Sequence, residues 1–130
     1  MKKFIPFLVG VLALAFTPAI SSANHHGDKK MEMAPQTVIH VVTVSWKEDA
    51  SEADIQKALD GVHELAKAYD GILRVWTKTR SAQGNRSHAF VMEFKDEQAL
   101  TDYAGSQAQK DWYEVYLPVR DRSTTFGIMN

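Results

Sequence analysis

The chain has 130 residues, 45% of them hydrophobic, and a net charge of −1 at pH 7, which suits one domain with its own apolar core. It contains no cysteine, so disulfides, thiolate catalysis and a bacterial lipoprotein anchor are excluded. Its 15 basic and 16 acidic residues nearly balance, which leaves no basic field to attract nucleic acid.

Residues 1–23 have the three parts of a secretory signal peptide. Lys2 and Lys3 supply the positive charge, an almost wholly apolar run follows, and Ser21 and Ala23 are small residues suited to cleavage. The apolar run is shorter than the roughly 20 residues that a transmembrane helix needs. We therefore expect a secreted, periplasmic protein with no membrane association after cleavage. An uncleaved membrane anchor is the alternative interpretation.

Residues 24–36 form a polar leader, which we expect to be flexible. Cleavage after the signal would place His26 at the third position, directly after His25. A free amine, two deprotonated amides and an imidazole can bind Cu(II) or Ni(II) in a square plane, and the thioethers of Met31 and Met33 suit Cu(I). The leader is therefore a candidate metal site. A polar linker with incidental histidines is the alternative.

The first predicted strand, residues 38–46, is apolar on both of its faces. Val42 and Val44 lie on one face, and Ile39 and Val41 lie on the other. A strand with this pattern is covered on both sides of the sheet.

We place the domain at residues 37–130. After the first strand, its sequence shows further helix and strand patterns. Ser51 opens a helix with a capping-box-like pair, and Gly71 suits a left-handed cap at the end of that helix. The later elements are a strand at 72–80, a hairpin loop at 81–87, a strand at 88–95, helical pieces at 96–104 and 107–116, and a strand at 123–128. This β-α-β-β-α-β order predicts an α+β, ferredoxin-like fold with an antiparallel sheet and helices on one face.

Helices on one face would leave the other face of the sheet bare. Because that face carries Ile39 and Val41, a second copy of the chain is the simplest cover, and we predict a homodimer.

A series of short segments then points to a known family. They are Val38-Ile39-His40-Val41-Val42 with Trp46-Lys47, Ser51-Glu52, Gly71-Ile72, the strand from Ser87 to Phe94, Tyr103, and Trp112-Tyr113. In this order, over residues 37–128, they resemble the stress-responsive α/β-barrel (Dabb) domain family. The resemblance implies a ferredoxin-like protomer whose sheet packs on its partner's sheet to form a dimeric α/β barrel.

The resemblance also implies a pocket between the sheet and the helices. One branch of the family includes a plant polyketide cyclase, whose base is a histidine in the second-helix region, with a tyrosine nearby and a first-strand histidine in the pocket. Here His40 matches the strand histidine and Tyr103 the tyrosine, but Gln109 stands where the base would be. An amide takes up no proton near neutral pH, so we expect no such cyclisation and assign no catalytic residue.

The predicted ligand contacts are His40, Val42, Phe90, Met92, Tyr103 and Trp112. The alternative for the apolar and aromatic members is an ordinary core, where we also expect Trp76. His40 would then be a buried histidine bonded to a backbone group or a tyrosine, and we expect a structural role for His88.

The sequence is compatible with three functions. The leading prediction is an exported homodimer that binds a small, partly apolar ligand without clear catalysis or a cofactor. The second is a cofactor-free enzyme, of cyclase, lyase or monooxygenase-like type, that uses the same pocket, because fold alone does not separate binding from catalysis. The third is a periplasmic copper- or nickel-binding protein that uses His25 and His26.

Overall fold

Four strands and three helices make up residues 36–130, the part of the chain that the computed structural model describes. In chain order they are β1 (Val38–Trp46), α1 (Glu52–Ala68), β2 (Ile72–Trp76), β3 (His88–Phe94), α2 (Glu97–Tyr103), α3 (Gln107–Tyr116) and β4 (Arg120–Ile128). The predicted signal peptide and nearly all of the leader lie outside the described residues. Gly105, with a φ of +81°, separates α2 from α3, because a left-handed residue ends a helix.

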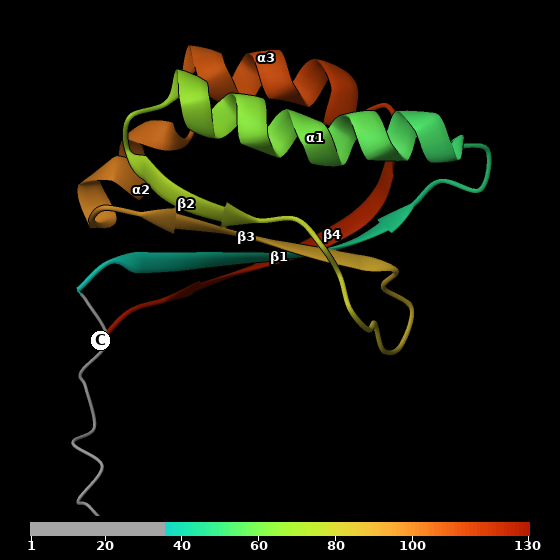
Figure 1. Ribbon diagram of the computed structural model, residues 1–130, viewed down its shortest axis with the longest axis horizontal. Coiled ribbons are helices and arrows are strands. Elements are labelled where there is room, and N and C mark those ends of the chain that lie inside the picture. Colours follow the sequence, from blue (N-terminus) through green and yellow to red (C-terminus); the bar gives the residue numbers. More distant parts are fainter. Residues whose placement is uncertain (1–35) are drawn as a thin grey trace, which may run out of the picture. The chain divides into compact units, whose positions relative to one another are not determined.

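The sheet has the strand order β2-β3-β1-β4, and each neighbouring pair is antiparallel. All three helices lie on one side of it (Figure 1). This arrangement confirms the predicted ferredoxin-like fold, with the second helix of the pattern divided in two. Within residues 36–130, no helix is long and apolar enough to cross a membrane.

The hydrophobic core lies between the sheet and the helices. Alternate residues of β1 and β3 point into it, and Val42 pairs there with Phe90. Phe90, Met92 and Trp112, for which an ordinary core position was the alternative to ligand contact, are buried there, and so is Phe94. From α1, the core receives Ala58, Leu59, Val62 and Leu65.

Helix α1 begins as predicted but ends differently. The Ser51 hydroxyl accepts a hydrogen bond from the Asp54 backbone N–H at 3.1 Å, which satisfies a free donor of the first turn. The left-handed cap predicted at Gly71 was wrong, since Tyr69 caps the helix in an extended conformation and Gly71 has no positive φ. A glycine is still required there, because a Cβ would lie 2.4 Å from the Tyr69 ring and 2.9 Å from the Ala99 Cβ.

Two strand boundaries also differ from the prediction. β2 ends at Trp76 instead of continuing to Arg80, because the Thr79 hydroxyl takes over both backbone groups of Ala89, at 2.9 and 3.0 Å. A side chain thus replaces the strand ladder. β4 begins at Arg120 rather than Ser123, because a β-bulge opposite Ser45 and Trp46 extends its pairing with β1.

The centre of the helix-free face of the sheet is apolar, as the pattern of β1 predicted. Val41 lies across from Val91 on one side and Phe126 on the other. Placing Trp76 in the core was wrong, since it is 50% exposed and pairs with Val91 on this face. A register shift at the start of β2 explains the error, because it turns Ile72 into the core and leaves Trp76 on the opposite side.

Candidate functional site

A pocket of about 340 Å³ lies between the sheet and helices α2 and α3. Strands β1, β3 and β4 form its wall on the sheet side. Of the predicted ligand contacts, it brings together His40, Val42, Met92, Tyr103 and Trp112. Phe90 lies behind this wall, with its ring centroid 5.7 Å from that of Trp112. Pockets of roughly 300–1,000 Å³ with apolar walls and a few polar groups are typical of small-molecule sites.

The first polar group of the pocket is His40, which β1 directs toward the helices. Its ring stands edge-on to Phe94 at a centroid distance of 5.9 Å. Burial lowers the pKa of His40 below its ordinary value of 6.5, because the charged form loses solvation. At neutral pH the imidazole is therefore uncharged, and it can accept a proton or a hydrogen bond.

Tyr103 and Gln109 form the wall that α2 and α3 contribute. Burial raises the pKa of Tyr103, whereas the hydrogen bond between Tyr103 and Gln109 lowers that pKa by a smaller amount. Gln109 donates to the Tyr113 hydroxyl at 3.2 Å and accepts from the Gly105 N–H at 2.7 Å. The amide thus occupies the pocket as a fixed hydrogen-bonding group, and it supplies no base.

Sequence reasoning missed the polar residues that β4 places in the same pocket. Arg120 and Ser123 both line it, and the Arg120 Nη1 donates to the Ser123 hydroxyl at 3.3 Å. The Arg120 guanidinium also lies over the Tyr116 ring, 5.7 Å from its centroid. Only the bulge brings these side chains together, and no periodic signal in the sequence predicts a bulge.

The two other histidines within residues 36–130 have local partners. The Nδ1 of His88 accepts a hydrogen bond from the Trp46 indole at 2.8 Å, which agrees with the structural role predicted for it. His63 is exposed and bonds to the Thr77 hydroxyl at 2.9 Å. Among residues 36–130 there is no group of three or more histidine and acidic residues that could hold a metal ion. His25 and His26 lie outside the described residues.

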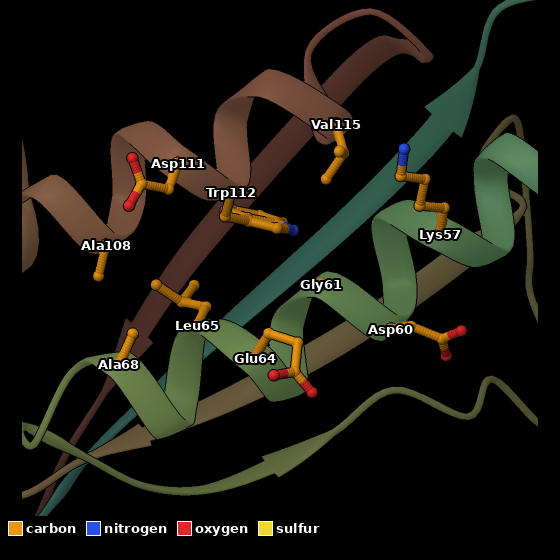
Figure 2. Close-up of a pocket in the computed structure, with 10 residues that line it drawn as sticks. All are labelled: Lys57, Asp60, Gly61, Glu64, Leu65, Ala68, Ala108, Asp111, Trp112 and Val115. Atoms are coloured by element: carbon orange, nitrogen blue, oxygen red, sulfur yellow. The ribbon is translucent and has the colours of Figure 1, made fainter.

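A larger hollow, of about 520 Å³, lies on the outer surface between α1 and α3 (Figure 2). Leu65 and Trp112 lie between the two helices there, and acidic side chains such as Asp60 and Asp111 stand along its edges. Trp112 comes so near to α1 that a Cβ on Gly61 would lie 2.8 Å from its ring. Among the described residues, no buried polar atom without a partner belongs to this groove. The inner pocket is therefore the better candidate site.

Comparison with known proteins now identifies the family. The family model "Stress responsive A/B Barrel Domain", Dabb, matches residues 38–129. The chain belongs to the Dabb family. None of the curated proteins matches it.

Several solved structures share the fold at low sequence identity. An Arabidopsis thaliana protein has a TM-score of 0.65 and 18% identity, with 72% of this chain and 94% of that chain covered. A hydroxynitrile lyase from Passiflora edulis has a TM-score of 0.66 and 14% identity, covering 75% and 95%. A dimeric ferredoxin-like protein of unknown function from Thermobifida fusca has a TM-score of 0.61 and 12% identity, covering 72% and 91%.

Proposed function

We propose that this Dabb protein is a homodimer that binds a small, partly apolar ligand in the pocket between the sheet and helices α2 and α3. The observation that supports the ligand is the composition of the pocket wall. Met92, Leu100 and Trp112 offer an apolar surface, while His40 and Tyr103 add polar groups from opposite layers. Such a wall suits a molecule with an apolar body and one or two polar substituents.

The proposed dimer rests on the helix-free face of the sheet. On this face, more than half of the surface of Phe126 and of Ile128 is exposed, at 55% and 56%. Both residues pair with the most apolar part of β1, so the exposed surface is continuous with other apolar side chains. Burying such a surface is worth about 25 cal/mol per Å², and a two-fold partner would bury the same face on both chains. Similar structures described as dimeric, from Thermobifida fusca, Bacteroides fragilis and Jannaschia, support this assembly.

An enzyme with the same pocket is the second candidate. It is supported by the fold shared with the Passiflora edulis hydroxynitrile lyase and by an uncharged His40 in the pocket wall. Because Gln109 supplies no base, His40 is the group that would take a proton. The wild type would then release cyanide from an aromatic hydroxynitrile, and a His40→Gln variant would not. A wild type that releases no cyanide would remove the enzyme candidate.

Export and the metal-binding leader remain proposals from the sequence. They rest on the signal-like residues 1–23 and on His25 and His26. Sequencing the amino terminus of the exported protein tests both: we expect a start at Asn24, and a start at Met1 would remove export and the square-planar site together.

The binding proposal predicts a specific response to a neutral apolar probe. N-phenyl-1-naphthylamine should bind with a saturable rise in fluorescence, and Leu100→Trp should weaken that binding at least about tenfold, because a larger side chain would fill the pocket. Leu117→Trp is the matched control, since Leu117 is exposed and lies outside the pocket wall. Equal binding to both variants would place the probe elsewhere and contradict the proposal. Thermal unfolding should show that both variants are folded.

A further inference from the structure

The β-bulge between β1 and β4 determines which side chains enter the pocket from β4. In a regular strand, two residues that are three positions apart point to opposite faces of the sheet. Arg120 and Ser123 are three positions apart, yet they line the same pocket and share a hydrogen bond. The register shift opposite Ser45 and Trp46 is responsible, and bulges of this kind often redirect a side chain next to a binding site.

Arg120 is a cation without a carboxylate partner. Among the residues that line the pocket it alone is an arginine or a lysine, and none is an aspartate or glutamate. None of the salt bridges within residues 36–130 includes it. Its Nε is buried and has no hydrogen-bond partner, although a buried donor normally has one. The half-buried guanidinium is therefore left with one unused buried donor and with no carboxylate to compensate its charge.

Tyr116 provides a second unused group beside it. Tyr116 is 3% exposed, and its hydroxyl makes no hydrogen bond of full geometry among the described residues. Burial raises the pKa of Tyr116, while weak hydrogen bonding with Ser123 and the charge and weak hydrogen bonding of Arg120 act in the opposite direction. A group that lowers this pKa donates to the phenol oxygen, so the hydroxyl proton still lacks an acceptor. The hydroxyl therefore stays protonated at neutral pH and can donate.

We propose that the ligand is a small apolar acid, and that Arg120 and Tyr116 bind its carboxylate or equivalent oxyanion while its apolar body lies against Trp112, Met92 and Leu100. The inference rests on the proposed ligand-binding function. An oxyanion satisfies both free donors at once, since guanidinium and carboxylate match in charge and geometry. A neutral ligand would cover the guanidinium of Arg120 without compensating its charge.

Two probes with the same rings separate the charge from the pocket. The anion 8-anilinonaphthalene-1-sulfonate differs from N-phenyl-1-naphthylamine by its sulfonate. Arg120→Met should weaken binding of the anion about tenfold or more, the usual effect of losing a charge-assisted hydrogen bond, and change binding of the neutral probe less than about twofold. Arg120→Lys should recover part of the loss, because it keeps the charge. Arg122→Met is the matched control, since the exposed Arg122 pairs across from Ser45 on the helix-free face.

The outcomes distinguish this inference from the function on which it rests. A loss confined to the anion in Arg120→Met, with Arg122→Met unchanged, supports it. An equal effect of Arg120→Met on both probes, or none on either, overturns the anion site while the pocket stands. If neither probe binds the wild type, the proposed pocket function fails, and the anion site fails with it.

Discussion

A Val41→Asp variant should be monomeric under conditions in which the wild-type protein is a dimer. Val41 belongs to β1, an inner strand of the sheet, and lies on the helix-free face between its register partners Val91 and Phe126. In a sheet-to-sheet dimer, its replacement would bury a carboxylate with no cation beside it. Such an uncompensated charge costs at least about 3 kcal/mol, and a two-fold axis would apply that cost twice.

Light scattering at micromolar concentration measures this effect. The wild type should scatter with about twice the mass of one chain, and Val41→Asp with the mass of one. Ala53→Asp is the control: Ala53 is exposed in the first turn of α1, where a negative charge is tolerated, so this variant should remain dimeric. A monomeric wild type, or a dimeric Val41→Asp, would show that the apolar face has another role.

An Arg74→Met variant should be less stable than the wild type, because the buried carboxylate of Glu93 would lose its charged partner. Glu93 is 1% exposed on the helix-free face. The Arg74 Nε donates to one oxygen of its carboxylate, and the Nη2 donates to the other at 2.8 Å. The Thr37 hydroxyl also donates to it, at 2.8 Å. Without the arginine, Glu93 keeps one hydrogen bond and no countercharge. Arg74 itself is 62% exposed, so solvent screens part of the interaction that the variant loses.

The pH dependence of unfolding gives the same variant a distinctive signature. Hydrogen bonding with Arg74 is the main cause that lowers the pKa of Glu93 below its ordinary 4.5. In the wild type, this pair therefore stabilises the fold above about pH 4.5 and ceases to do so as the pH falls through the lower, folded pKa. In Arg74→Met, burial instead raises the pKa of Glu93, so its stability should increase when the pH falls from 7 to 5.

Denaturant unfolding at fixed protein concentration measures both effects. A further Glu93→Gln substitution should restore much of the stability that Arg74→Met loses, because an amide has no charge to compensate. Lys78→Met removes an exposed cation that lies beyond the end of β2 and should have little effect. An Arg74→Met variant with wild-type stability and pH dependence would contradict this account.

The order of the elements was predictable because each one carries a local signal. The alternation of valines in residues 38–46 indicated a strand covered on both sides, and the structure places Val42 in the core and Val41 on the helix-free face. The capping serine at position 51 marked the start of α1 in the same way. Such signals depend on neighbouring residues alone, and a single sequence is enough to recognise them.

The errors arise where distant residues decide the structure. β2 is short because Thr79 bonds to the backbone of Ala89, and Trp76 changes face because of a register shift against β3. Arg120 enters the pocket through a bulge against β1. Each of these depends on pairing between strands that are separate in sequence. The pocket wall on α2 and α3 was partly predictable through the resemblance at Tyr103, whereas the contribution of β4 was not.

Binding of an apolar ligand in the inner pocket can be observed in a ¹³C-methyl spectrum of methionine-labelled protein during titration with N-phenyl-1-naphthylamine. Met92 is fully buried and lines the inner pocket, whereas Met129 is 48% exposed beside Ile128. We expect the Met92 resonance to shift and to saturate with the fluorescence, the Met129 resonance not to move, and Leu100→Trp to abolish the Met92 shift. A saturating shift of Met129 with Met92 unchanged would contradict binding in the inner pocket, because the apolar ligand would then bind the helix-free face of the sheet.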